Sequence, residues 1–231
     1  LDDRPGGIVE SVSTDSSPAQ SPQNLQELIL QNDALRMDNP TGAQLEHGQV
    51  GIQEVHRTQG GDPAYIVQIP PTEGSGFSDV PGAYGEQGNS RDWGSNLRLV
   101  SGQHPAVMDD VRAAMEAAEV PPGSEVFIVG HSQGGIVANH LSADPTFNSA
   151  SGDPGTYNVT HTFSVGSPVQ TVIPSQLSTQ SVNVNHENTI GPGGSSGDLI
   201  AALDLNGVQI DGGILGAPNR HEVSLPGYPV P

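Results

Sequence analysis

The sequence predicts an α/β fold in which a central, mostly parallel sheet is flanked by helices. Three observations predict it. An apolar run, a glycine-rich turn and a helical pattern follow one another over 125–141, and an amphipathic helical pattern over 105–119 precedes them. Further strand-like runs occupy 158–165 and 182–185. Alternation of helix and strand is typical of the crossover units that build parallel sheets.

The composition excludes several classes of protein. The chain has 231 residues and a net charge of −19, with 26 Asp and Glu against 7 basic residues, all arginine. An acidic surface of this kind should repel nucleic acids and anionic membranes, so we expect no nucleic-acid partner. We also expect no stable membrane insertion, because no apolar run approaches the roughly 20 residues that a spanning helix needs. Cysteine is absent, which excludes disulfides.

The N-terminal segment divides into a tail and a helix. Residues 1–22 are polar and weakly patterned, and we interpret them as a tail or arm preceding a single domain over 23–231. Ser21 followed by Pro22 is a favourable helix start, and the apolar pattern from Leu25 continues to about Arg36. The chain begins with Leu1, which indicates a processed form. Richness in Ser, Thr, Gly and Pro without lysine points to a secreted or cell-surface bacterial protein.

Two strands and a long loop follow. Residues 50–57 and 64–69 have strand patterns around the turn at 59–63, and we expect a hairpin that enters the larger sheet. A glycine-rich stretch then reaches about residue 96. Long loops of this kind are usually functional, and Trp93 in it either lines a site as part of a lid or anchors the loop on the core.

The most informative motif is Gly130-His131-Ser132-Gln133-Gly134-Gly135. It has the G-x-S-x-G pattern that places a nucleophilic serine on a sharp turn between a strand and a helix. Glycine tolerates the close contacts of such a turn, and the helix N-terminus favours negative charge beside the serine. The alternative is a glycine-rich turn with an incidental serine. The pattern predicts Ser132 as the nucleophile of an acyl-transfer reaction.

A serine nucleophile needs a base and an oriented carboxylate, which follow it in the order Ser, acid, His. His140 is expected on a helix, His161 within a strand, and His186 after a strand at a place that suits the acid. His221 lies in the segment 206–231, which we interpret as irregular and as the region where the base normally sits. We therefore expect His221 to be the base.

The acid has four candidates. Asp198 opens an apolar segment after the glycine-rich loop at 191–197, and we favour it. Glu187 lies closer to the preceding strand, and Asp204 and Asp211 are further alternatives. Each of these carboxylates is otherwise a solvated surface group.

The oxyanion formed during acyl transfer needs two donors. One should be the backbone N–H of Gln133, directly after the nucleophile. The second should come from the loop after an earlier strand. Pro70 and Pro71 have no N–H, so Thr72 is the first donor available there.

Several stretches together resemble the α/β-hydrolase esterases and lipases of secreted bacterial type, which are related to the triglyceride lipases of filamentous fungi. The similarity runs from about residue 50 to the C-terminus. Its motifs are Val67 to Thr72, Asp92-Trp93 to Asn96-Leu97, Gly130 to Gly135, Gly166-Ser167-Pro168-Val169, and His221 followed by Tyr228. Pro71 stands where the family has glycine.

The resemblance implies an α/β-hydrolase fold with a long loop over the active site, and a Ser132–His221–Asp198 triad with Thr72 and Gln133 as oxyanion donors. It implies hydrolysis of a small-molecule ester or lipid, without a cofactor or a metal ion. Alternatives are an acyltransferase with the same triad, a non-catalytic binding module, and a metal-binding domain that uses the carboxylates around 198–211.

Overall fold

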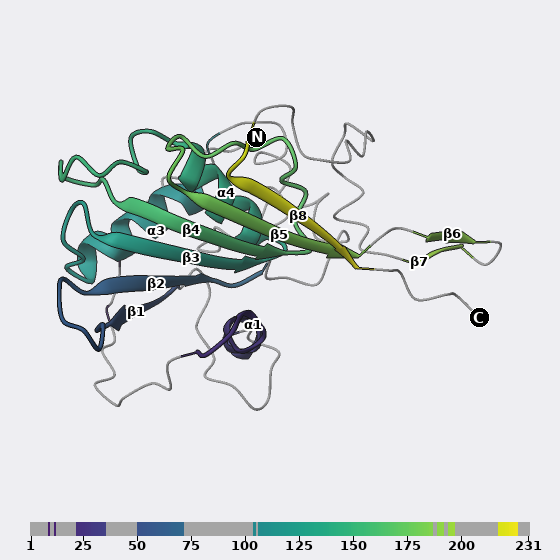
Figure 1. The fold of residues 1–231 in the computed structure, drawn as a ribbon, viewed down its shortest axis with the longest axis horizontal. Coiled ribbons are helices and arrows are strands. Elements are labelled where there is room, and N and C mark those ends of the chain that lie inside the picture. The colour runs from purple at the N-terminus through teal and green to yellow at the C-terminus, as the bar shows by residue number, and fades with distance from the viewer. Residues whose placement is uncertain are drawn as a thin grey trace.

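The computed structural model describes residues 9, 12, 22–35, 50–71, 104, 106–186, 189–191, 194–196 and 217–225. These residues form an α/β structure with a six-stranded, mostly parallel sheet of order β1-β2-β3-β4-β5-β8 (Figure 1). Its strands are β1 Gly51–Val55, β2 Ala64–Ile69, β3 Glu125–His131, β4 Asn158–Val165, β5 Gln180–His186 and β8 Arg220–Leu225. Strand β1 pairs antiparallel with β2, and every other neighbouring pair is parallel.

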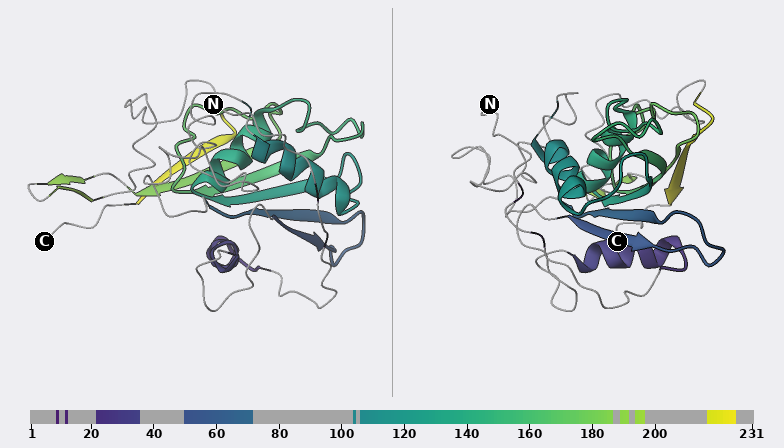
Figure 2. Two further views of the ribbon diagram at one scale, coloured as in Figure 1. Left: turned by 180° about the vertical axis from the view of Figure 1, so that it is seen from behind. Right: turned by 90° about the vertical axis from the view of Figure 1, so that its left-hand side faces the viewer.

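Helices cover both faces of this sheet. Helix α1 (Leu25–Ala34) lies on one face, whereas α3 (Ala106–Ala117) and α4 (Gln133–Ala143) lie on the other (Figures 1 and 2). The apolar core on the α3 and α4 side includes Val67, Ile128 and Met115, all fully buried. A smaller apolar cluster on the α1 side joins Leu28 to Val129 and Phe163. A parallel sheet buried between helices is the expected packing for such strands.

Most elements agree with the sequence prediction, including the hairpin of β1 and β2, the strand β4 and the helices α3 and α4. The N-cap of α1 is Asn24 rather than Ser21, and the Asn24 side chain accepts a hydrogen bond from the N–H of Glu27. The interpretation of 191–197 as a plain loop is wrong in part, because Thr189–Gly191 and Gly194–Ser196 form a short antiparallel pair, β6 and β7. The interpretation of 206–231 as irregular is also wrong, because it contains β8.

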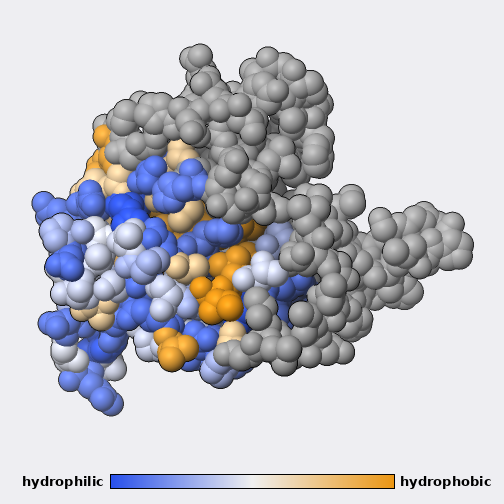
Figure 3. Space-filling view, turned by 90° about the horizontal axis from the view of Figure 1, so that it is seen from above, coloured by the Kyte–Doolittle hydropathy of each residue, from blue (hydrophilic) through white to orange (hydrophobic). Residues whose placement is uncertain are grey.

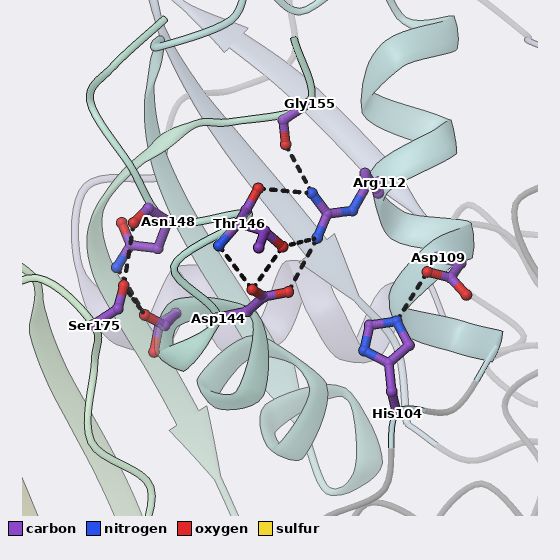
Figure 4. A network of polar contacts seen from close by, with 9 residues as sticks. His104, Asp109, Arg112, Asp144, Thr146, Asn148, Gly155 and Ser175 are labelled. Atoms are coloured by element: carbon purple, nitrogen blue, oxygen red, sulfur yellow. Dashed lines mark hydrogen bonds and ion pairs between the residues drawn. The ribbon is translucent and has the colours of Figure 1, made fainter. Parts of the chain in front are cut away.

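Arg112 joins α3 to the loop that follows α4 (Figure 4). Its guanidinium donates hydrogen bonds to the carbonyls of Thr146 and Gly155 at 3.0 and 2.9 Å, and lies 3.1 Å from the carboxylate of Asp144. The same group stacks over the ring of Phe147. A single planar guanidinium thus makes all of these contacts between α3 and the loop after α4.

We expect Arg112→Lys to lower the free energy of unfolding by about 2 kcal/mol, because an ammonium group keeps the charge but loses the fork and the stacking. Urea unfolding followed by circular dichroism measures this. Arg57→Lys is the matched control, since Arg57 pairs with Glu125 at the surface and half of its side chain is exposed. Equal losses in the two variants would contradict the role given to Arg112.

The sheet has a polar layer on its α4 side, in the half formed by β4, β5 and β8. The hydroxyls of Thr162 and Ser181 hydrogen-bond across the two strands at 2.6 Å, and Ser164 donates to Asn183 at 2.7 Å. Asn183 also donates to Glu222 of β8 at 3.0 Å. Buried polar groups in these positions are satisfied by one another, as burial requires.

Candidate active site

Ser132 lies between the last residue of β3 and the first residue of α4, as the motif predicts. Its backbone angles are φ 54° and ψ −120°, and Glu119 is the other non-glycine residue with positive φ in the described part of the chain. Such a conformation stores about 1–3 kcal/mol of strain and is found mainly where function or packing requires it. The strand and helix on either side hold the serine there.

Three glycines allow this turn to form. A Cβ on Gly134 would lie 2.0 Å from the carbonyl oxygen of Ile69, and one on Gly130 would lie 2.2 Å from the carbonyl carbon of Gly134. A Cβ on Gly135 would lie 2.1 Å from Oγ of Ser167. We call residues 130–135 the elbow. No larger side chain fits at these three positions without moving the backbone or a neighbouring side chain.

The backbone of Ser132 is fixed while its side chain makes no capping bond. Its N–H donates to the carbonyl of Val165 at 2.9 Å, and its own carbonyl accepts from Gly135 and Ile136 of α4. The hydroxyl of Ser167 donates to that same carbonyl at 2.8 Å. A serine at a helix N-cap usually uses its hydroxyl to cap the helix, but Ser132 does not. This distinguishes it from an ordinary capping serine.

The structure describes one of the two predicted oxyanion residues, Gln133, but not Thr72. Gln133 begins α4, so its N–H belongs to the first turn, whose N–H groups have no acceptor within the helix. Thr72 lies outside the described residues. Strand β2 ends at Ile69, and the carbonyl oxygens of Ile69 and Pro70 lie against Gly134. The chain therefore reaches the elbow two residues before Thr72.

The structure does not bring His221 beside Ser132. His221 belongs to β8, not to a loop beyond the last strand, so that part of the prediction is wrong. His221 pairs with Val182 of β5, whereas His131 is level with Val184, two residues further along that strand. The strands β4 and β5 also lie between β8 and β3. Three strand spacings amount to about 14 Å. The exposed His221 ring lies 3.3 Å from Oε1 of Gln180.

Of the other candidate histidines, His140 and His161 lie where the sequence predicts, whereas His186, expected after a strand, belongs to the strand β5. His140 is on α4 and His161 is within β4. His186 ends β5 and pairs with Leu225, so its backbone lies at the carboxyl-terminal edge of the sheet, at about the level of Ser132. Two strand spacings, about 10 Å, separate the two residues across the sheet.

None of the predicted acids is described by the structure. Asp198 and the alternatives Glu187, Asp204 and Asp211 lie outside the described residues, as does Trp93 with the stretch predicted to be a long loop. Among the described residues, no group of three or more His, Asp or Glu side chains could hold a metal ion. No helix in that part of the chain is long and apolar enough to cross a membrane.

Burial lowers the pKa of His140 from its usual value of 6.5, and the charge of His104 lowers it further. The neutral ring is therefore favoured in the folded state. Below about pH 6.5 the unfolded chain binds this proton more readily than the folded one, so stability falls as the pH drops. We expect urea unfolding at pH 8 and pH 5 to show a smaller loss of stability for His140→Gln than for the wild type. Equal losses would contradict this.

Sequence patterns did not reveal a pair of side chains that joins the elbow to α1. Nδ1 of His131 lies 3.0 Å from Oδ1 of Asp33, which is in the last turn of α1. The neighbouring Asn32 is completely buried against the ends of β2 and β3. The residues in these contacts are 37 to 98 positions apart in the chain, and no local pattern marks them. The single available signal was His131 itself, inside the motif.

Comparison of the chain with protein-family models, with curated proteins and with solved structures finds no match.

Proposed function

We propose that the protein is a serine hydrolase of the α/β-hydrolase type that cleaves carboxylic esters, with Ser132 as its nucleophile. The observation that carries the proposal is the strained backbone of Ser132 between β3 and α4, together with a hydroxyl that does not cap the helix. A strained turn between a strand and a helix is where hydrolases of this type carry their nucleophilic serine. The resemblance of the sequence motifs to esterases and lipases agrees with it.

In the proposed reaction, Oγ of Ser132 attacks the ester carbonyl carbon while a histidine takes its proton. The tetrahedral oxyanion is held by the N–H of Gln133 and by a donor from Thr72. The bond to the alcohol oxygen then breaks, and the histidine returns its proton to the leaving alcohol. Water repeats these steps on the acyl-enzyme and releases the carboxylic acid.

Two histidines compete for the role of base. The sequence motifs favour His221, with Asp198 as the acid. The strand register favours His186, whose backbone lies at the edge of the sheet where Ser132 lies. Replacing each histidine by alanine separates the two, because loss of the base slows acylation by orders of magnitude and loss of a surface histidine does not.

The surface supports a small-molecule ester as the substrate more than an aggregated lipid. Seen from above, the described residues are mostly hydrophilic, with a small apolar area near the centre (Figure 3). Their exposed large apolar side chains lie in pairs on α1, on β8 and in segments outside the helices and strands, namely Leu25, Leu30, Val223, Leu225, Val9, Val12, Ile173 and Leu177. A broad apolar patch is the usual feature of an interfacial surface.

The test is labelling with a fluorescent fluorophosphonate, alongside hydrolysis of p-nitrophenyl butyrate. We expect the wild type to be labelled and to hydrolyse the ester, and Ser132→Ala to lose both activities. The His186→Ala and His221→Ala variants then identify the base. A wild type that is folded, unlabelled and inactive would contradict the proposal.

A non-catalytic binding module is the second candidate. The position of His221, exposed and three strands away from Ser132, is the observation that favours it. In that case the elbow would be a structural turn, and the folded wild type would be neither labelled by the fluorophosphonate nor active on the ester.

A further inference from the structure

We propose that the C-terminal end of α1 is a positioning element for the nucleophile, in which Asn32 and Asp33 hold the end of β2 and the elbow at a fixed separation. This inference rests on the proposed serine hydrolase function. Neither residue would touch the substrate in this role. They would act through the two backbone segments that carry the oxyanion donors and Ser132.

Asn32 bridges two strands. Its Nδ2 donates to the Gln68 side chain at 3.0 Å and to the carbonyl of Ile69 at 3.2 Å, both in β2. The carbonyl of Val129 in β3 lies 3.5 Å from the same nitrogen. A single amide therefore contacts the last two residues of β2 and the strand β3, which leads into the elbow.

The carbonyl of Ile69 is held from two sides. Asn32 donates to it from the α1 face, and Gly134 packs against it from the α4 side, where no Cβ could fit. Pro70, Pro71 and Thr72 follow directly in the chain. A shift of this carbonyl would move the predicted oxyanion donor relative to Ser132. Misplacement by about 1 Å can cost an enzyme about a hundredfold in rate.

Asp33 fixes the other side of the same arrangement. Its Oδ1 lies 3.0 Å from Nδ1 of His131, the residue directly before Ser132. The two side chains are 38% and 28% exposed, so the bond is shielded from water in part. Together, Asn32 and Asp33 connect α1 to the end of β2 and to the residue directly before Ser132.

The polarity of Asn32 argues against a purely structural role. The residue is 0% exposed, and within the described part of the chain neither its Oδ1 nor Nε2 of Gln68 has a hydrogen-bond partner. Buried atoms of this kind reduce stability, so stability alone does not account for an amide at this position. Leu28, one turn earlier on the same helix, shows that α1 packs on this face with a leucine. Polar residues that reduce stability are expected at functional positions.

The experiment separates an effect on the position of the reacting groups from an effect on the stability of the fold. We expect Asn32→Leu to remain folded, with a lower melting temperature because Oε1 of Gln68 loses its donor, and to react with the fluorophosphonate at least about tenfold more slowly than the wild type. We expect Leu28→Ala, which removes apolar packing from the same helix, to melt at a lower temperature but to react within about twofold of the wild-type rate. Rates are compared below the melting temperature of every variant and per folded molecule.

Asp33 supplies a second, independent comparison. Asp33→Leu should slow labelling, whereas Asp33→Asn should restore most of the rate, because the amide oxygen can still accept from Nδ1–H of His131. Labelling of both Asn32→Leu and Asp33→Leu at the wild-type rate overturns the inference; if Asn32→Leu does not fold, the Asp33 pair decides. An unlabelled wild type would instead contradict the proposed function.

Discussion

Gly134→Ala is expected to destroy the elbow, lowering the free energy of unfolding by more than about 4 kcal/mol and abolishing fluorophosphonate labelling. The added methyl group would lie 2.0 Å from the carbonyl oxygen of Ile69 and 2.8 Å from that of Pro70. Both atoms are backbone, so no side-chain rotation relieves the overlap. The helix would have to move away from β2, and Ser132 with it. Urea unfolding and labelling measure the two effects.

Gly51→Ala is the control, since it adds the same methyl group to β1, in the sheet against which Gly134 of α4 packs. That group would lie 3.3 Å from Cδ1 of Leu35, the end of a flexible side chain that can shift. We expect a change within about 1 kcal/mol. If the two alanine variants are equally stable, then α4 does not approach β2 as closely as the structure shows.

Glu222→Leu is expected to lower the free energy of unfolding by about 3 kcal/mol, because it removes the carboxylate from a buried cation. The side chain of Arg220 is 0% exposed and pairs with Glu222, which is 24% exposed. The amides of Asn183 and Asn185 also donate to this carboxylate. The guanidinium and both amides would lose this acceptor, although Arg220 keeps the carbonyl of Val172 and Asn183 keeps that of Ser167. Urea unfolding at pH 7 measures the combined loss.

A double replacement tests the cause. In Arg220→Met with Glu222→Leu the buried charge is absent, so we expect much of the lost stability to return. Glu125→Leu is the control, since Glu125 pairs with Arg57 at the surface and should cost less than about 1 kcal/mol. A double variant less stable than Glu222→Leu alone would show that the charge of Arg220 is not the source of the loss.

The parts of the fold that could be predicted are those with a strong local pattern. The elbow, α3 and β4 follow from apolar periodicity and from glycine spacing within a few residues. Strand β8 could not be found this way, because Arg220 is its single buried residue and the next five residues are exposed. An edge strand covered on neither side has little reason to alternate apolar and polar residues.

The residues of the candidate site likewise differ in whether a local sequence pattern predicts them. Ser132 and Gln133 belong to one continuous motif, so their relation to each other is encoded locally. The contacts of Asn32 and Asp33 join residues 36 to 98 positions apart and depend on where a helix docks on the sheet. His221 looked suitable from chain order, but chain order does not determine the level at which a residue lies within its strand.

The polar layer on β4, β5 and β8 determines how these strands can align. A shift of β5 by two residues would keep each side chain on its own face, so apolar alternation alone cannot prevent it. The same shift would part Thr162 from Ser181 and Ser164 from Asn183, and it would also part Ser181 from Asn139 of α4 and Asn183 from Glu222. These hydrogen bonds therefore disfavour a misaligned sheet that apolar packing alone would allow. The cores of β-proteins designed from apolar side chains alone lack this safeguard.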